Sequence, residues 1–246
     1  MHHCLYNQKD NHYQDRARRS FSAFTAVLYL LIGLFLFPGV AGAQSEELYG
    51  SSAPEDAAFV RVFNYRSSGT VSSLKIGSIE FQEVEVNEAT AYRPVNPGVH
   101  AVYLGEAHEE IIAGEESYYT VLLGDEGPKA FEDPIHTRAD RAQIILYNVS
   151  MEKSIELRTA DGENVIIEST AKGESEEVVV NPVEAELAVF VSDNSDSGDP
   201  EVSIGDIDLE RGQSYGLFAL ETGDPCEEGS QNGAEVIIRR GEVLTE

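Results

Sequence analysis

The sequence predicts an all-β protein that consists of two tandem immunoglobulin-like antiparallel β-sandwich domains joined by a linker. Short apolar stretches are separated by Gly, Pro, Asn and Asp at the spacing of about eight to twelve residues that is typical of sandwiches. Within one such stretch, Val84 and Val86 alternate with Glu83 and Glu85, which is the two-residue period of a half-buried strand. No long apolar stripe with helical period interrupts this pattern, so we expect little helix.

An internal repeat supports the division into two domains. Three landmarks recur in the same order: a buried strand that ends in an aromatic residue and Asn, an Asn-Pro turn before another strand, and a Ser-Tyr pair that opens a later strand. Their paired positions are Asn64 and Asn148, Asn96 and Asn181, and Tyr118 and Tyr215. The last pair lies farther apart than the first two, which predicts an insertion in the second copy, at the polar segment 193–200.

Each copy contains enough short strand candidates for one sandwich. In the first copy these are 58–65, 71–76, 79–86, 91–95, 98–104, 109–113 and 117–123. In the second copy they are 142–148, 155–158, 164–169, 177–180, 186–191, 202–209 and 213–220, with a further edge strand at 234–239. The intervening segment is rich in Asp, Pro and Gly. We therefore expect a first domain over 57–124, a linker over 125–140 and a second domain over 141–246.

The N-terminal residues have the pattern of an export signal. Three arginines, at positions 16, 18 and 19, precede the uncharged apolar run 21–37, and Ala41-Gly42-Ala43 follows as a small-residue cleavage pattern. We predict a signal peptide over 1–43, a flexible lead-in over 44–56 and a periplasmic location. An uncleaved membrane anchor is the alternative interpretation, because the apolar run is intermediate in length between the two kinds of segment.

The charge of the chain excludes several classes of partner. The formal net charge is −27 over 246 residues. Nucleic acids and anionic lipids require patches of Lys and Arg, so we expect neither as a partner. A solvated acidic surface is the simpler interpretation, and docking on a basic partner is the alternative. After removal of the signal, Cys226 is the one remaining cysteine, so no internal disulfide is expected.

One pair of residues resembles part of a catalytic site. Asp133 and His136 match the D-x-x-H spacing of SGNH-type esterases and acetyltransferases, in which the His activates a serine and the Asp orients the His. The Gly-Asp-Ser nucleophile of such enzymes has no counterpart, since Gly205 and Asp206 are followed by Ile207. We therefore interpret the pair as linker residues and regard it as a weak catalytic candidate.

Other candidate sites are similarly weak. His108 lies among glutamates but has no second His at ligand spacing, and no phosphate-binding or dinucleotide-binding motif is present in the sequence, so we expect no metal and no cofactor. Arg61, Tyr65 and Arg93 are candidates for contact with a partner or a sugar, because basic residues are scarce and these arginines lie near aromatic residues. A structural cation–π contact is the favoured alternative for both arginines.

Several segments resemble a known family. Leu48-Tyr49-Gly50, the segments PEDAAFVRVFN at 54–64 and YRPVNPGVHAVYL at 92–104, and the restart at 142–148 are similar to the alginate biosynthesis proteins of the AlgF family, and the resemblance extends over most of 48–220. It implies a periplasmic accessory role in alginate O-acetylation. The implied partners are a membrane-bound acetyl-transferring protein and periplasmic SGNH-like proteins, which add acetyl groups to mannuronate hydroxyls. The resemblance brings no catalytic residue with it.

Three functions therefore remain open from the sequence. The first is an adaptor or accessory component of the alginate acetylation complex, with transient contact with alginate left open. The second is a secreted carbohydrate-binding or cell-surface sandwich. The third and least favoured is an acetyltransferase that uses Asp133 and His136.

Overall fold

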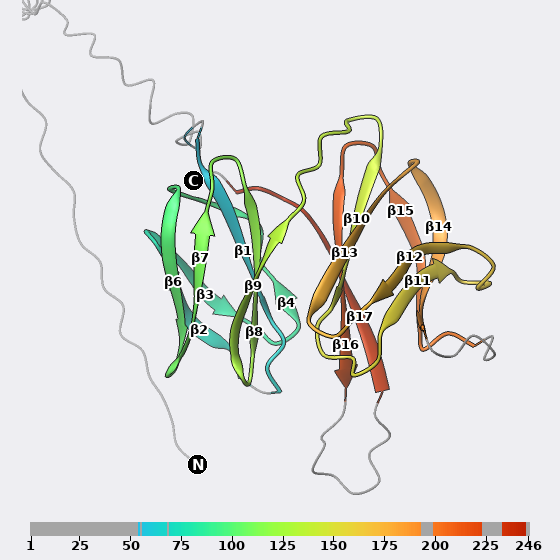
Figure 1. Cartoon of the computed structure of the whole chain (residues 1–246), viewed down its shortest axis with the longest axis horizontal. Coiled ribbons are helices and arrows are strands. Elements are labelled where there is room, and N and C mark those ends of the chain that lie inside the picture. The colour runs from blue at the N-terminus through green and yellow to red at the C-terminus, as the bar shows by residue number, and fades with distance from the viewer. Residues whose placement is uncertain (1–53, 55, 68, 193–198, 223–232, 245–246) are drawn as a thin grey trace, which may run out of the picture. The chain divides into compact units, whose positions relative to one another are not determined.

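The structure is a computed structural model, and it describes residues 54, 56–67, 69–192, 199–222 and 233–244. Every regular element within these ranges is a β-strand (Figure 1). No helix in the described ranges has the length and apolar character needed to cross a bilayer. The all-β prediction is thus confirmed. The predicted signal peptide over 1–43, residues 193–198 of the predicted insertion and Cys226 lie outside the described residues.

The first half of the chain forms one sandwich. Its strands are β1 (Ala58–Asn64), β2 (Val71–Ile76), β3 (Ile79–Val84), β4 (Glu88–Ala89), β5 (Arg93–Val95), β6 (Gly98–Leu104), β7 (Ala107–Ala113), β8 (Tyr118–Gly124) and β9 (Gly127–Asp133). One sheet has the order β4-β1-β8-β9, with β5 also paired to β1. The hairpins β2-β3 and β6-β7 contribute the opposite side and enclose a core that includes Val60, Leu74, Val102 and Val121.

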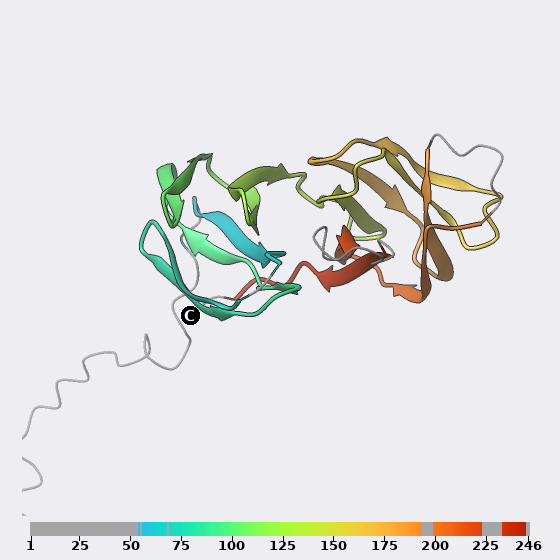
Figure 2. The ribbon, with the colours of Figure 1, turned by 90° about the horizontal axis from the view of Figure 1, so that it is seen from below.

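The second half repeats this arrangement. Its strands are β10 (Ala142–Asn148), β11 (Ile155–Thr159), β12 (Val165–Thr170), β13 (Glu174–Val180), β14 (Val183–Val191), β15 (Val202–Leu209), β16 (Ser214–Thr222) and β17 (Gly233–Arg240). One sheet has the order β13-β10-β16-β17 and the other β12-β11-β14-β15. They enclose a separate core that includes Ile144, Leu157, Leu187 and Leu217, and Figure 2 shows the strands of each half surrounding its own interior.

The pairing departs from a purely antiparallel sheet at one equivalent place in each half. β1 pairs in parallel with β8, and β10 pairs in parallel with β16. All other strand pairs are antiparallel. A parallel pair needs a crossover connection, and here the intervening strands of the sandwich provide it.

The repeat holds in atomic detail, with one correction to the predicted alignment. The Asn64 and Asn148 side-chain amides each donate to two backbone carbonyls of the following loops and strands. The third pair is Tyr119 and Tyr215 rather than Tyr118 and Tyr215. Each of these two hydroxyls donates to the backbone carbonyl seven residues earlier in the chain, at 2.8 Å. The adjacent tyrosines made the one-residue offset invisible in the sequence.

The segment 125–140, predicted to be a linker, contains strand β9. β9 pairs with β8 over its whole length, from Gly127 to Asp133, and it occupies the same place in the first sheet that β17 occupies in the second. Only Pro134 to Arg141 connects the two sandwiches at this point. A second connection comes from the C-terminal end, where Val243 forms a parallel bridge with Tyr92 of the first sandwich.

Strands β1 and β10, which lie inside their sheets, are buried on both faces. In β1, Val60 and Val62 face the first core, whereas Phe63 faces the other way and joins a third cluster. That third cluster also contains Tyr147 of β10 and Phe218 of β16. The rings of Phe63 and Phe218 are stacked with their centroids 4.2 Å apart. Because each strand serves two cores, its sequence is almost continuously apolar instead of alternating.

Candidate functional site

A group of buried polar side chains lies where these two sheets meet. Its members, here called the buried polar cluster, are Arg61 of β1, Tyr92, Thr120 of β8, Asp133 at the end of β9, and Tyr147 of β10. The exposed fractions of Arg61 and Asp133 are 1% and 3%, which is rare for charged residues unless they are paired. The cluster is therefore the most unusual chemical environment in the described part of the molecule.

Hydroxyl groups connect the guanidinium to the carboxylate. Arg61 Nε donates to Thr120 Oγ1 at 2.8 Å, and Arg61 Nη2 donates to Tyr147 Oη at 3.1 Å. Thr120 Oγ1 donates to Asp133 Oδ2 at 2.5 Å, and Tyr147 Oη donates to Asp133 Oδ1 at 2.5 Å. Tyr92 Oη adds a third donor to Asp133 Oδ2, at 2.7 Å. Both charges are thus compensated within the fold.

The directions of these hydrogen bonds follow from the donors available. A guanidinium has no acceptor, so Thr120 and Tyr147 must accept from Arg61. Each hydroxyl then has its own proton to donate, and both protons point to Asp133. The carboxylate therefore acts as an acceptor on both oxygens, and Tyr92 completes the set. Every oxygen of Asp133 is occupied by the fold itself.

The pKa shifts agree with a structural role for these groups. Burial raises the pKa of Asp133, while Arg61 and the three hydroxyl donors act in the opposite direction, and the net shift is upward. Burial also raises the pKa of Tyr92 and of Tyr147 well above the usual range for tyrosine, so both stay protonated and able to donate. Burial acts to lower the pKa of Arg61, but Tyr147, Tyr92 and Asp133 outweigh it and the net shift is upward.

Aromatic rings and one glycine complete the environment of the guanidinium. The Arg61 guanidinium carbon lies 4.5 Å from the ring centroid of Tyr92 and 5.3 Å from that of Phe218. A Cβ added to Gly216 of β16 would lie 2.8 Å from Arg61 Nη2, closer than real Cβ atoms approach. Gly216 therefore provides the space into which the first sandwich inserts its arginine.

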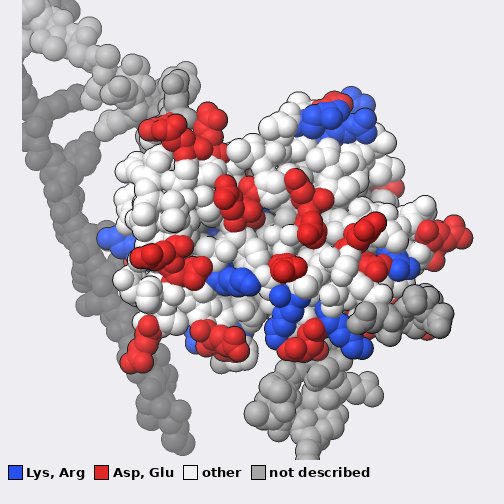
Figure 3. Space-filling model, viewed as in Figure 1, with Lys and Arg blue, Asp and Glu red and all other residues white. Residues whose placement is uncertain are grey.

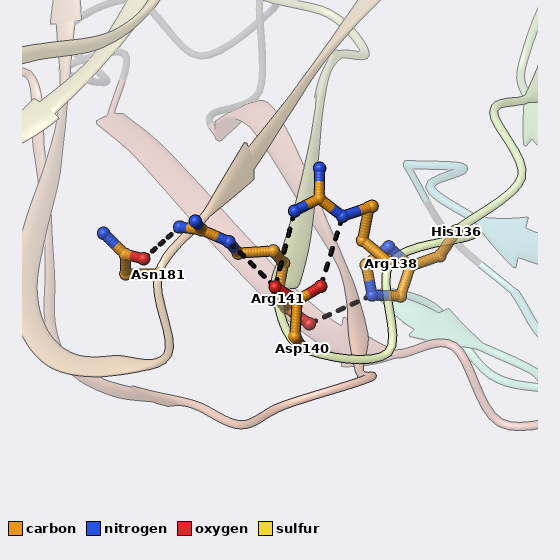
Figure 4. Close-up of polar contacts among 5 residues, drawn as sticks. All are labelled: His136, Arg138, Asp140, Arg141 and Asn181. Carbon is orange, nitrogen blue, oxygen red and sulfur yellow. Dashed lines mark hydrogen bonds and ion pairs between the residues drawn. The ribbon is translucent and has the colours of Figure 1, made fainter.

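Asp133 and His136 do not form the dyad that their spacing suggested. In a catalytic triad the carboxylate accepts a hydrogen bond from the imidazole. Here His136 Nε2 lies 3.1 Å from the carbonyl oxygen of Arg141 and donates to it, and Nδ1 has no hydrogen-bond partner among the described residues (Figure 4). Asp133 is bound instead by Tyr92, Thr120 and Tyr147. The interpretation of Asp133 as a linker residue is wrong, because Asp133 ends β9 and is buried, whereas His136 does lie in the connection between β9 and β10.

The connection after β9 is held mainly by its own contacts. Figure 4 shows Asp140 between Arg138 and Arg141, with Arg138 Nε and Asp140 Oδ1 3.2 Å apart. Arg141 also bonds the side chain of Asn181, and its carbonyl accepts from Gly212 N at 2.7 Å. Beside this connection lies a small cleft of about 140 Å³, whose lining includes Tyr118, His136, Gln143 and Ser214.

The three residues predicted to contact a partner or a sugar have different environments. Arg61 is not available for such a contact, because it is buried and its guanidinium is engaged within the cluster. Arg93 Nη1 donates to the carbonyl of Glu80 at 2.8 Å, and its guanidinium lies over the Phe81 ring. Tyr65 is partly buried against Gly124, where an added Cβ would lie 2.2 Å from its hydroxyl oxygen.

Sequence reasoning missed Thr120 and Tyr147. A signal was nevertheless present, since Arg61 and Thr120 are polar positions inside otherwise apolar strands, FVRVF and YYTVLL. A polar residue in a strand that is buried on both faces needs a partner. Within the described ranges no three His, Cys, Asp or Glu side chains are grouped so that they could hold a metal ion.

Comparison with protein families and with known sequences identifies one family. The family described as "Alginate O-acetyl transferase AlgF" matches residues 32–216. The "Alginate biosynthesis protein AlgF" of Pseudomonas syringae pv. tomato is 29% identical over 81% of this chain and 86% of its own length, and that of Pseudomonas putida is 27% identical over 82% and 92%. The solved C-terminal domain of AlgF from P. aeruginosa is 23% identical, with a TM-score of 0.31, over 41% of this chain and 99% of that domain.

Proposed function

From the premise that this chain belongs to the AlgF family, we propose that it acts in the periplasm as a non-catalytic adaptor in alginate O-acetylation. Involvement in alginate acetylation follows from the family itself. The adaptor role is the finer proposal: the chain would hold a membrane-bound acetyl-transferring protein and periplasmic SGNH-like proteins in contact while mannuronate hydroxyls are acetylated.

The engagement of Asp133 carries this proposal. An acyl transfer needs a nucleophile, a base that takes its proton and a group that orients the base. Asp133 is the one acid that the sequence places at catalytic spacing from a histidine, and both of its oxygens accept hydrogen bonds from the fold. Its use in joining two sandwiches supports a scaffold, because a scaffold requires its binding surfaces to keep a fixed relation.

Acetyl content of secreted alginate tests the proposal in the native host. Deletion of the gene should abolish acetylation, and full-length protein carrying His136→Ala should restore at least about half of it, because the one hydrogen bond of the His136 side chain among the described residues is to a backbone carbonyl. Purified protein should transfer no acetyl group to alginate from a soluble acetyl donor. Loss of acetylation in the His136→Ala strain, with the protein present and folded at wild-type level, would instead indicate an active site.

The periplasmic location is tested by the mass of the protein recovered from the cell envelope. We expect the chain to begin after Ala43, as the small-residue pattern at 41–43 predicts. A recovered protein that retains the apolar run 21–37 would support the anchored alternative.

A further inference from the structure

The hairpin β6-β7 exposes an apolar face. Ile112, Val99 and Tyr103 have exposed fractions of 75%, 65% and 62%, the highest of the large exposed hydrophobic side chains in the described residues. Singly exposed apolar residues are ordinary, but a contiguous group of them marks an interaction surface. The three most exposed large apolar side chains of the described residues therefore all lie in this one hairpin.

The strand register places the three side chains on one face. Val99 is paired with Ile112, Ala101 with Glu110, and Tyr103 with His108. Side chains at directly paired positions, and at every second position along a strand, lie on the same side of a sheet. The alternate positions Val102 and Ile111 are buried in the first core. The outward face of the hairpin, here called the hairpin face, is thus made of Val99, Ala101, Tyr103, Ile112 and their paired residues.

Tyr103 is held in place before any partner arrives. Its ring stacks on that of His108, with the centroids 5.6 Å apart and the planes at 25°. A tyrosine whose ring is already ordered loses little conformational freedom on binding, which is one reason why tyrosine is frequent at the centres of protein interfaces. The hairpin face therefore has a pre-arranged aromatic group at one end and an aliphatic pair at the other.

Acidic residues surround this face. Glu110 lies on it, Glu106 is exposed at the turn beside Tyr103, and Glu115 and Glu116 are exposed just beyond the strand that carries Ile112. Figure 3 shows uncharged surface over part of β6 and β7, with acidic side chains both within it and around it. Such a border repels polyuronates and anionic lipid, and it also opposes pairing of two copies of a chain whose net charge is −27. It favours a surface with the opposite charge.

We propose that the hairpin face is the docking site for a protein partner that presents an apolar patch bordered by Lys and Arg. The inference rests on the proposed adaptor function and assigns it a surface. The aliphatic pair and Tyr103 are covered by the partner, and Glu106, Glu110, Glu115 and Glu116 orient it.

Paired variants test the hairpin face in the native host, with full-length protein in the deletion strain. Val99→Thr with Ile112→Thr keeps the β-branched shape and removes apolar surface, so the strands should persist. Val165→Thr with Val183→Thr is the matched control, since those side chains are 49% and 51% exposed on the second sandwich. At equal protein level, the first variant should lower the acetyl content of secreted alginate about fivefold or more, and the control should change it less than about twofold.

Two further variants report on charge and on contact. Glu110→Lys reverses one charge on the hairpin face and should also lower acetylation. It still tests the proposal if the Val99→Thr, Ile112→Thr double variant does not accumulate in the cell.

A photo-crosslinking residue at position 103 should form an adduct with a protein of the acetylation system, and one at position 183 should not. The adduct at position 103 should disappear in the Val99/Ile112 variant.

The outcomes separate this inference from the function on which it rests. Unchanged acetylation in the deletion strain would refute the adaptor role itself. Loss of acetylation in the deletion strain together with wild-type acetylation in both the Thr pair and Glu110→Lys would refute only the hairpin face. An adduct at position 103 with alginate or with a second copy of this chain would likewise overturn the proposed partner.

Discussion

The two sandwiches share one strand plan but differ at the positions where they meet. In the first, the parallel pair β1 and β8 places Arg61 directly beside Thr120. In the second, the equivalent pair β10 and β16 places Ile145 beside Gly216. One copy thus supplies a large cation and the other supplies the space for it. This complementary divergence shows how a repeat can acquire an interface that neither copy could form with itself.

The two copies also differ at a second pair of equivalent positions, Phe63 and Tyr147. Phe63 is the next-to-last residue of β1, as Tyr147 is of β10, and each is followed by the Asn that recurs in both copies. Both rings pack in the cluster between the sheets, but only Tyr147 has a hydroxyl, and that hydroxyl bridges Arg61 and Asp133. The second sandwich therefore contributes one polar group to a cluster that the first sandwich otherwise provides.

The largest expected effect is at Arg61. Arg61→Leu leaves Asp133 buried without its compensating charge, and breaking a buried pair from one side costs about 3–5 kcal/mol. Ile145 occupies the equivalent position in the other copy, and Ile145→Val, which removes one methylene, should cost about 1 kcal/mol. Urea unfolding of the two variants measures the difference. Similar losses in both would show that the polar cluster contributes no more than ordinary packing does.

The next largest effect is at Tyr147. Tyr147→Phe makes the second copy match Phe63 of the first, and it removes the donor to Asp133 Oδ1 and the acceptor for Arg61. Leaving buried charged groups short of a partner should cost about 2–3 kcal/mol in the free energy of unfolding. Thermal unfolding provides the measurement. A neutral result would mean that a water molecule or a repacked side chain replaces the hydroxyl.

The two tyrosines of the buried polar cluster, Tyr92 and Tyr147, predict how the stability of the protein depends on pH. Burial raises the folded-state pKa of Tyr92 and Tyr147, so the folded protein retains their protons to higher pH than the unfolded chain does. This contribution to stability is complete below the unfolded-state pKa of about 10 and is lost as pH rises above it. When urea midpoints are measured from pH 8 to pH 11, the midpoint should decrease once the pH exceeds about 10, and it should decrease less steeply in Tyr147→Phe. Parallel curves for the two proteins would contradict the assignment.

The space at Gly216 gives a further comparison. In Gly216→Ala the new Cβ would lie 2.8 Å from Arg61 Nη2 and 3.2 Å from Phe218, so the guanidinium must shift, at a cost of about 1–3 kcal/mol. Gly114→Ala is the control, because its Cβ would meet only Ser117 at an ordinary 3.6 Å. If Gly216→Ala is harmless in the Arg61→Leu background, the two positions are coupled as the structure indicates.

How well the sequence predicts a strand depends on how apolar that strand is. Strands β1 and β10 are almost continuously apolar, and the sequence predicts their ends to within one residue. β9 was missed because only Ala130 and Phe131 are apolar in it, although the edge strand 234–239 had been recognised at the equivalent place in the second copy. Applying the repeat strictly would have predicted β9 as well.

The site was less predictable, for a physical reason. Asp133 was interpreted through a local spacing, Asp133 with His136, whereas its actual partners come from three distant segments of the chain. A sequence pattern identifies neighbours along one strand or turn, but a buried polar cluster is selected by tertiary packing. The signal that the sequence does contain is the position of Arg61 and Thr120 inside the apolar runs FVRVF and YYTVLL.

The smallest expected effect concerns the positions where the two copies remain alike. Tyr119 Oη donates to the Ile112 carbonyl and Tyr215 Oη to the Asp208 carbonyl, each at 2.8 Å and each seven residues back along the chain. Because the geometry is the same, Tyr119→Phe and Tyr215→Phe should each cost about 0.5–1.5 kcal/mol, and the double variant should cost their sum, since the two hydroxyls share no partner. Tyr215 also accepts from Glu210 N at 2.9 Å, so its loss should lie at the upper end of that range. Urea unfolding of the two single variants and the double variant checks this. A double variant far less stable than the sum would mean that the two positions are energetically coupled through the contact between the sandwiches.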